Sequence, residues 1–205
     1  MLNWVLTAVG AYFLGSIPSG LWICQWLGDV DIRQYGSKNT GATNVYRVMG
    51  VKAALLVFLM DALKGALGVA LGAWITQDPL GALLGGLMAL VGHTWSFWMN
   101  FKGGRGVATG IGVLASLTPQ VAAIAFVIWL VTVLLTRYVS LGSILGSIGA
   151  VVAVWWLPFP WYYQVFVTLI GLFVILRHRE NIDRLRKGTE SKIGRIETSQ
   201  KEEEK

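Results

Sequence analysis

The sequence predicts an all-α polytopic membrane protein, a seven-span helical bundle with its N-terminus outside the cell and its C-terminus in the cytoplasm. The chain of 205 residues is 55% hydrophobic and only 14% charged, and its mean hydropathy is +0.60. Soluble domains carry roughly 25% charged residues. The apolar residues also form runs long enough to cross a bilayer. These observations exclude an ordinary soluble domain.

Six apolar runs give the expected spans in chain order: 4–27, 51–75, 80–99, 107–136, 139–156 and 162–176. The first run is interrupted by Gly15–Gly20, a break that a membrane helix tolerates when neighbouring protein satisfies the freed backbone groups. The run 107–136 is too long for one comfortable crossing at about 1.5 Å per residue. Pro119 divides it, so we expect it to cross twice and the total to be seven.

The distribution of Lys and Arg sets the expected topology. These residues gather in 29–52, in 102–105, at Arg137 and from Arg177 onward, whereas the turns at 76–79 and 157–161 contain none. Cationic loops stay on the cytoplasmic side. The net charge of +6 therefore reflects topology, and we expect the lipid bilayer rather than nucleic acid as the partner. We expect one integral-membrane domain over 1–197 and a disordered cytoplasmic tail over 198–205.

The segment Asn100–Gly110 places two cations among glycines. Glycine lets the backbone approach a ligand closely, and Lys102 and Arg105 add positive charge where a helix is expected to begin at Val107. Such a loop favours an anion, with phosphate the natural ligand. The glycines match neither a nucleotide-binding P-loop nor a dinucleotide fingerprint. We expect no cofactor and no metal. The alternative is a cytoplasmic turn with small residues for helix packing.

Three polar clusters, 36–47, 93–106 and 177–190, fall on the expected cytoplasmic face, where the bundle could bring them together. Neutral donors and cations of this kind suit two phosphate-like anions. His178 and Asn181 lie one helical turn apart. The candidate side chains are Ser37, Asn39, Thr43, Asn44, Arg47, Lys102, Arg105, His178 and Asn181. Taken singly, each has a structural alternative as a topology anchor, a turn cap or a snorkelling side chain.

Two charges fall inside the second expected span. Asp61 and Lys64 are three residues apart, so they share a helix face, and intramembrane charges are costly unless paired. We expect a structural ion pair, with a role in lining a polar cavity as the alternative. His93 lies at the end of the third span. The structural alternative to a role in the site is a histidine at the membrane interface whose hydrogen bonds are satisfied.

The three clusters resemble the motifs of a family of bacterial membrane enzymes, the acyl-phosphate-dependent glycerol-3-phosphate acyltransferases (the PlsY family). The first motif resembles Gly36–Asn44 with Arg47. The second resembles Gly92–Thr94 and Phe101–Thr109, and the third resembles His178–Ile182 with Arg184 and Gly188–Glu190. The likeness runs from Gly15 to Glu190, with three motifs in the right order.

The resemblance implies transfer of the acyl group of an acyl phosphate to the 1-hydroxyl of sn-glycerol 3-phosphate, giving lysophosphatidic acid and phosphate in the first step of phospholipid synthesis. It implies a multi-pass protein of the bacterial plasma (inner) membrane with a cytoplasmic active site. The implied catalytic residues are Ser37, Arg47, His178 and Asn181. The implied substrate-binding residues are Asn39, Asn44, Lys102, Gly103, Gly104, Arg105, Gly106 and Thr109.

Within that resemblance, Glu190 matches a motif glutamate for which a structural role is expected. Two positions depart from the family pattern: Arg105 stands where the family commonly has lysine, and Asp183 stands where a cation or neutral residue is common. A guanidinium keeps the charge but replaces a point donor with a fork.

Two other functions remain open. A transporter of a phosphorylated anion could also contain Asp61 and Lys64, although repeat symmetry and a polar path between both faces would then be expected. An acyl-CoA-dependent acyltransferase could use His178 and Asp183 as a base and its orienting carboxylate, in a His-x4-Asp arrangement.

Overall fold

The computed structural model describes residues 1–194, and this part of the chain is helical without strands. The predicted tail 198–205 lies outside the described residues. The α-helices are α1 (Leu2–Ser16), α2 (Ser19–Gly28), α3 (Ala42–Met49), α4 (Val51–Thr76), α5 (Pro79–Thr94), α6 (Val107–Leu117), α7 (Pro119–Thr136), α8 (Val139–Trp156), α9 (Trp161–Arg177) and α10 (Arg179–Arg186), with single 3₁₀ turns at Ile32–Gln34 and Phe97–Met99.

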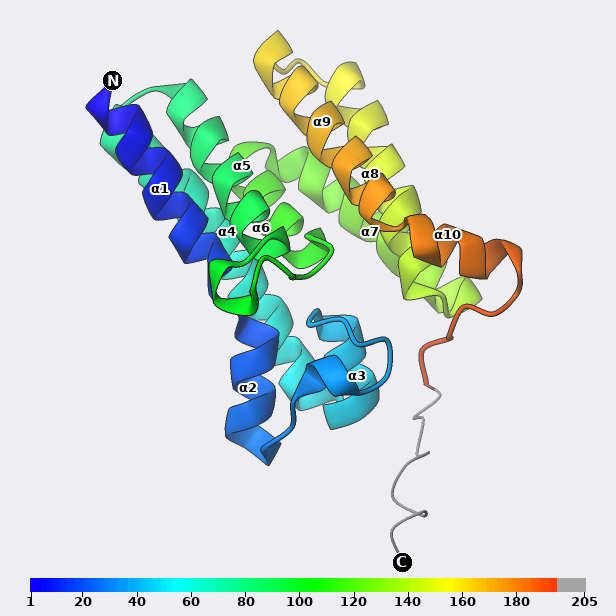
Figure 1. Cartoon of the computed structure of the whole chain (residues 1–205). Coiled ribbons are helices and arrows are strands. Elements are labelled where there is room, and N and C mark those ends of the chain that lie inside the picture. The colour runs from blue at the N-terminus through cyan, green and yellow to red at the C-terminus, as the bar shows by residue number, and fades with distance from the viewer. Residues whose placement is uncertain (195–205) are drawn as a thin grey trace, which may run out of the picture.

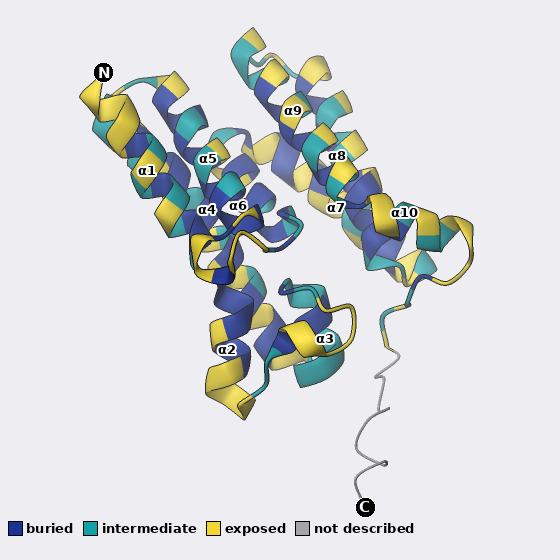
Figure 2. Cartoon of the chain, in the orientation of Figure 1, coloured by how far each residue is buried: buried dark blue, intermediate teal, exposed yellow. Residues whose placement is uncertain are grey.

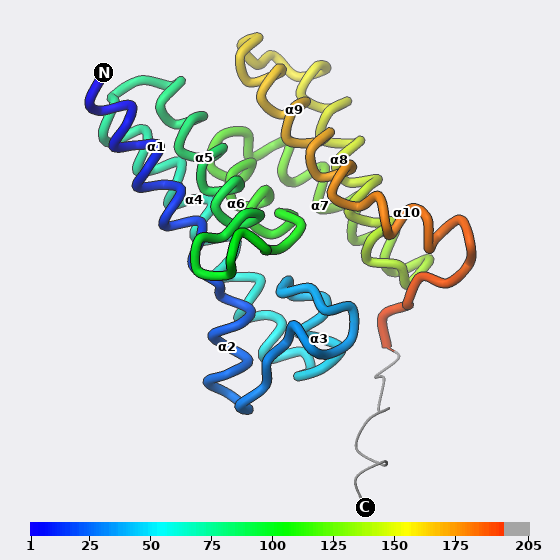
Figure 3. The backbone as a smooth tube through the Cα atoms, viewed as in Figure 1, coloured from blue at the N-terminus to red at the C-terminus, as the bar shows by residue number. Residues whose placement is uncertain are grey.

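The helices form two groups (Figure 1). α1, α4, α5 and α6 pack together, and α7, α8 and α9 form the second group. The tube in Figure 3 follows the chain from one group to the other through the α6–α7 junction. The short turns between α4 and α5 and between α8 and α9 lie at the same end of the bundle as the N-terminus. The α2–α3 loop, the glycine loop (Lys102–Gly106, between α5 and α6) and α10 lie toward the other end.

Two helix breaks fall where the sequence predicted them. α1 ends at Ser16 and α2 begins at Ser19, so the interruption within Gly15–Gly20 is confirmed. The long apolar run 107–136 is divided at Thr118, and Pro119 occupies the first turn of α7. Proline is favoured there because the first turn of a helix has no partner for its N–H.

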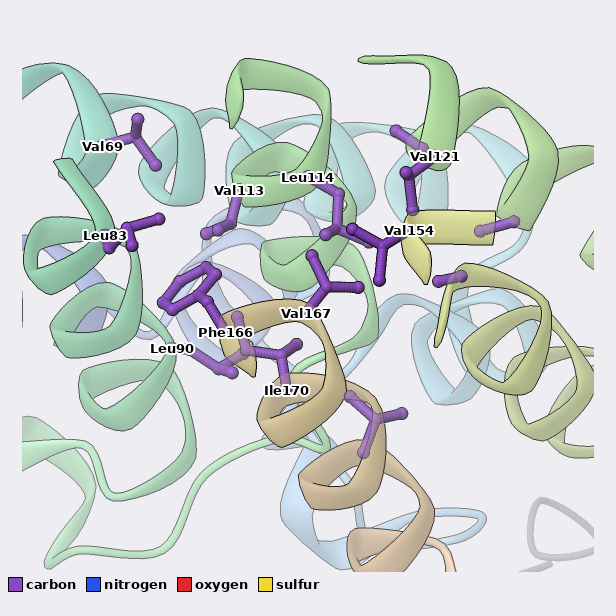
Figure 4. Close-up of a cluster of buried hydrophobic side chains, with 14 of the residues drawn as sticks. Val69, Leu83, Leu90, Val113, Leu114, Val121, Val154, Phe166, Val167 and Ile170 are labelled. Carbon is purple, nitrogen blue, oxygen red and sulfur yellow. The ribbon is translucent and has the colours of Figure 1, made fainter. Parts of the chain in front are cut away.

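One apolar core joins the two groups (Figure 4). Leu83 and Leu90 of α5 and Val113 of α6 lie in the same cluster as Val154 of α8 and Phe166 of α9. Each of these side chains is less than a tenth exposed. Because helices from both groups contribute to the core, it fixes the groups relative to each other.

The segment 29–50 differs from the polar loop that the sequence predicted, because it contains the amphipathic helix α3. Val45 is fully buried, and Val48 and Met49 pack against the same small cluster, which also holds Ile32 and Cys24. Apolar residues at spacings of three and four form a helix face, so a short helix among polar neighbours was the missed feature.

Within residues 1–194, five segments are long and apolar enough to cross a bilayer: Leu2–Gly28, Val51–Thr76, Pro79–Met99, Pro119–Thr136 and Val139–Trp156. α9 and α10 pass the same test as a pair bent by 55°. α6 is apolar but has only 11 residues. Outward helix faces are widely exposed (Figure 2), and Leu134 and Leu135 are 71% and 80% exposed. Apolar surface of this extent suits lipid contact.

Candidate active site

The first polar cluster is a loop organised by Asn44. The Asn44 side chain, 1% exposed, accepts a hydrogen bond from the Ser37 backbone N–H at 2.8 Å and donates to the carbonyls of Asn39 at 2.9 Å and Tyr35 at 3.0 Å. Asn39 in turn accepts from the Gly41 N–H at 2.8 Å. The amide of Asn44 is thus committed to the loop itself, and the Ser37 residue that it holds is exposed.

The second cluster is the glycine loop, Lys102–Gly106, between α5 and α6. The Gly104 N–H donates to the His93 carbonyl at 3.2 Å. A Cβ atom at Gly103 would overlap the His93 carbonyl, and one at Gly104 would overlap the His93 ring. Gly106 caps α6 with φ +82°, a left-handed conformation that favours glycine. The loop therefore lies pressed against His93.

The third cluster follows the bend between α9 and α10. His178 is 2% exposed, and its Nδ1 lies 2.7 Å from the Val174 carbonyl. A carbonyl can only accept, so Nδ1 carries the hydrogen and Nε2 is the ring nitrogen that can accept. Asn181 Nδ2 and Arg184 Nε each donate to the carboxylate of Glu190 at 2.7 Å. Burial raises the pKa of Glu190, but the side chains of Ser140, Asn181 and Arg184 outweigh it and hold the pKa below its ordinary value.

Contacts between distant segments bring the three clusters together. Arg47 of α3 donates to the Ser191 carbonyl at 3.0 Å, across 144 positions in sequence. Arg177 donates to the Gly104 carbonyl at 3.4 Å, and its guanidinium lies 6.0 Å from the centre of the Trp95 ring. α3, the glycine loop and the segments around α10 therefore meet at one end of the bundle.

Charges from the first and third clusters act on Arg105 of the glycine loop. Burial lowers the pKa of its guanidinium, and the charge of Arg184 lowers it further. Glu190 acts in the opposite sense and Arg47 in the same sense as Arg184. A guanidinium remains protonated despite such a shift. One residue of the glycine loop thus interacts with charges from both other clusters.

The predicted site residues differ in their accessibility. Exposed or half-buried positions are Ser37, Asn39, Arg47, Lys102, Gly103 and Arg105, and buried positions are Asn44, Gly104, Gly106, Thr109, His178 and Asn181. Thr109 is fully buried in α6, where its carbonyl lies against Gly65 of α4. Sequence reasoning did not single out Arg177 as a contact of the glycine loop. Its place in the last turn of α9, followed directly by His178, was the available signal.

The intramembrane charge pair is confirmed. Lys64 Nζ lies 2.7 Å from Asp61 Oδ1, and both side chains are buried. His93 Nδ1 lies 3.6 Å from the same oxygen, so the histidine belongs to the same group of buried side chains. Sequence reasoning considered His93 by itself and missed this association, which depends on how α4 packs against α5.

The His-x4-Asp arrangement is not formed as a catalytic dyad. The carboxylate of Asp183 is 61% exposed and pairs with Lys187 at 2.8 Å. His178, at the bend between α9 and α10, instead directs Nδ1 to the Val174 carbonyl of α9. Asp183 lies in α10, and its carboxylate does not orient the ring. The acyl-CoA-dependent alternative loses its structural basis.

Fold and site together define a polytopic helical membrane protein with a cationic polar site at one end of its bundle. Comparison with known proteins gives the same class. The model of a family described as glycerol-3-phosphate acyltransferase matches residues 5–188. A protein of that name from Synechococcus sp. (strain JA-2-3B'a(2-13)) is 45% identical over 95% of this chain and 96% of its own length. Another from Halalkalibacterium halodurans is 44% identical over 95% of this chain and 97% of its own length.

Two solved structures have the same fold. Both are described as PlsY (YgiH), an integral membrane glycerol 3-phosphate acyltransferase. The glycerol 3-phosphate form has a TM-score of 0.87 and 40% identity, covering 93% of this chain and 96% of that one. The lysophosphatidic acid form has a TM-score of 0.86 and 39% identity, covering 93% and 95%. The present chain belongs to the glycerol-3-phosphate acyltransferase family.

Proposed function

We propose that this protein transfers the acyl group of an acyl phosphate to the 1-hydroxyl of sn-glycerol 3-phosphate, forming lysophosphatidic acid and inorganic phosphate. The proposal rests on family membership over nearly the whole chain, with relatives at 40–45% identity that are named glycerol-3-phosphate acyltransferase. The cationic site is consistent with it, because both substrates carry phosphate and Arg and Lys side chains bind phosphate oxygens.

The chemistry requires positioning more than a nucleophile. An acyl phosphate is an activated mixed anhydride, so the hydroxyl of glycerol 3-phosphate can attack its carbonyl directly. The bond between the acyl carbon and the phosphate oxygen breaks as the new ester forms, and the departing phosphate takes the hydroxyl proton. The protein then has to bring two anions together and stabilise the charge that develops.

We assign the contact roles to side chains that the clusters bring to the site. Ser37, Arg47, His178 and Asn181 act in catalysis, with Ser37 and Arg47 directed to glycerol 3-phosphate. The exposed or half-buried Lys102 and Arg105, together with Gly103, Gly104 and Gly106, hold the head of the acyl phosphate. Asn39 and Asn44 act through the shape of the first loop, which their hydrogen bonds fix. Thr109, fully buried, supports the loop from α6.

The proposal includes a location. The three clusters lie toward the same end of the bundle as the α7–α8 junction, and the turns without cations lie at the other end (Figure 1). That junction contains Arg137, whose carbonyl accepts from the Ile193 N–H at 2.8 Å. The positive-inside rule then assigns the site to the cytoplasmic face of the bacterial plasma (inner) membrane, with the N-terminus outside. α6 counts as a short seventh crossing in this arrangement. The described residues 1–194 belong to the one integral-membrane domain predicted over 1–197, and we propose that this domain functions in the lipid bilayer.

The direct test supplies purified protein in detergent with acyl phosphate and glycerol 3-phosphate. We expect lysophosphatidic acid and inorganic phosphate in equal amounts. If neither forms while the protein remains folded, the enzymatic function is refuted. Uptake of glycerol 3-phosphate into proteoliposomes without any product would favour the transporter alternative. The polar clusters gather at one end of the bundle, whereas a transporter is expected to have polar residues along a path between both faces.

A further inference from the structure

A buried ionic cluster lies next to the glycine loop and the loop that carries Ser37, the two loops that the proposed function assigns to the substrates. It consists of Asp61, Lys64 and His93, each at most 6% exposed. Lys64 lies 2.7 Å from Asp61 Oδ1, and His93 Nδ1 lies 3.6 Å from the same atom. Lys64 also donates to the carbonyl of Ile17 at 2.9 Å, in the break between α1 and α2, and the same carbonyl accepts from the Ser19 N–H at 3.0 Å. The cluster therefore joins α4 and α5 to the break between α1 and α2.

The cluster contacts the glycine loop through His93. The His93 carbonyl accepts from the Gly104 N–H at 3.2 Å, and the His93 ring fills the space that a side chain at position 104 would need. Arg177 donates to the carbonyl of the same Gly104 at 3.4 Å. His93 of α5 therefore fixes the position of the glycine loop at Gly104, and with it the position of the neighbouring Arg105 backbone.

The cluster also reaches the first substrate loop. A small cavity, with room for about one water molecule, is lined by Asp61, Lys64 and His93 together with the helix break and Thr40. Thr40 belongs to the loop that carries Ser37, and its carbonyl packs against Gly20 of α2. One buried group of charges therefore borders both loops that the proposed function assigns to substrates.

We propose that Asp61, Lys64 and His93 are positioning residues for the acyl transfer: Asp61 orients His93, and the cluster sets the relative placement of the glycine loop and the Ser37 loop. This inference rests on the proposed function for the identity of the substrates. It gives the buried charges a purpose beyond stability, since a buried ion pair contributes little net stability compared with apolar residues of similar volume. None of the three side chains is assigned to touch a substrate.

The experiment separates positioning from folding. Asp61→Asn leaves Lys64 as an unpaired buried charge, so a lower thermal midpoint is expected together with raised KM values. The double variant Asp61→Asn/Lys64→Gln removes both charges and keeps a donor for the Ile17 carbonyl. We expect its midpoint to return toward wild type, while the KM for at least one of the two phosphate substrates remains raised about tenfold or more, because no carboxylate faces His93.

The matched control is Asp31→Asn/Arg33→Gln, which replaces the two partners of a partly exposed ion pair of 2.8 Å with neutral amides, as the buried double variant does. We expect wild-type KM values from it. The substrate whose KM rises in the buried double variant is the one whose phosphate is held by a loop that the cluster positions. Wild-type KM values for both substrates in a folded double variant would overturn the proposal. If that variant does not purify folded, His93→Gln gives the same comparison: a raised KM supports positioning and an unchanged KM refutes it.

A binding readout keeps this test independent of turnover. The thermal shift that glycerol 3-phosphate produces measures its affinity for the folded protein. We expect the double variant to show a smaller shift than wild type at equal ligand concentration. An equal shift together with unchanged KM values would leave no positioning role. A wild-type protein that binds glycerol 3-phosphate but forms no product would refute the proposed function alone.

Discussion

The side chain of Asn181 donates a 2.7 Å hydrogen bond to Glu190 Oε1, which joins the first turn of α10 to the segment that follows the helix. Arg184 donates to the second carboxylate oxygen at the same distance. The carboxylate thereby closes the third polar cluster on itself. This geometry matches the structural role expected for Glu190 and fixes Asn181 beside the buried His178.

Substitution of Glu190 should therefore lower stability as well as activity. In Glu190→Gln one carboxylate oxygen is replaced by an N–H₂ group that cannot accept. We expect a loss of about 2 kcal/mol, the scale of a hydrogen bond to a charged group, which corresponds to a fall of roughly 4–8 °C in the thermal midpoint. Differential scanning fluorimetry in detergent measures it.

Asp183→Asn is the matched control. It removes a carboxylate of α10 that is 61% exposed and paired with Lys187 on the surface. Such pairs contribute about 0–1 kcal/mol. We expect near wild-type midpoint and activity. A loss of activity of about a hundredfold or more would revive the dyad that the geometry does not form.

Acid should weaken the contacts of the Glu190 carboxylate with Asn181 and Arg184. The pKa of Glu190 is lower in the folded protein than its ordinary value, so the unfolded chain takes up its proton first as the pH falls. Stability from this group is complete above the ordinary pKa of about 4.3 and is lost as the pH falls through the folded-state pKa. We expect the difference in midpoint between wild type and Glu190→Gln to be constant from pH 8 to 6 and to shrink below about pH 4.3. A difference that grows in acid would contradict this.

The glycine loop allows a pairwise test of its packing. Gly104→Ala places a methyl group against the His93 ring, so the loop must move, and we expect at least a tenfold loss in kcat/KM. A Cβ at Gly110 of α6 meets nothing within 4 Å, and alanine favours a helix interior by up to about 1 kcal/mol. Gly110→Ala should keep wild-type activity with an equal or higher midpoint. Equal activities of the two variants would refute the conclusion that close packing of Gly104 against His93 is needed for activity.

Ser37→Ala and Arg47→Ala should reduce kcat/KM by about a hundredfold or more while the protein remains folded. Their proposed roles are contacts with glycerol 3-phosphate, and each charged hydrogen bond to a substrate is worth about 1.5–3 kcal/mol. Arg33→Ala, which removes an exposed cation paired with Asp31, is the control and should leave the rate unchanged. Wild-type rates in Ser37→Ala or Arg47→Ala would remove that residue from the site.

Much of the fold could be predicted because each feature has a local cause. Apolar run lengths indicate the membrane segments, Pro119 marks the start of α7, and the three-residue spacing of Asp61 and Lys64 predicts their ion pair. These properties depend on neighbours in sequence. The same holds for the cations that gather in a few short segments and indicate which end of the bundle holds the site.

What could not be predicted depends on contacts between distant helices. His93 belongs with Asp61 only because α5 packs against α4, and no local pattern encodes that crossing. Asn44 looked like a substrate ligand because its side chain is polar, whereas the fold uses both ends of its amide to shape the loop. The resemblance to a family supplied the substrates, which polarity and spacing alone left open between an enzyme and a transporter.

The acyl donor tests the central claim most directly. Wild-type protein is incubated with glycerol 3-phosphate and either an acyl phosphate or the acyl-CoA of the same chain length, and lysophosphatidic acid is quantified by mass spectrometry. The account predicts product only with the acyl phosphate, with one inorganic phosphate released per molecule of product. Product formed from acyl-CoA at an equal or higher rate, or no product from acyl phosphate, would contradict it.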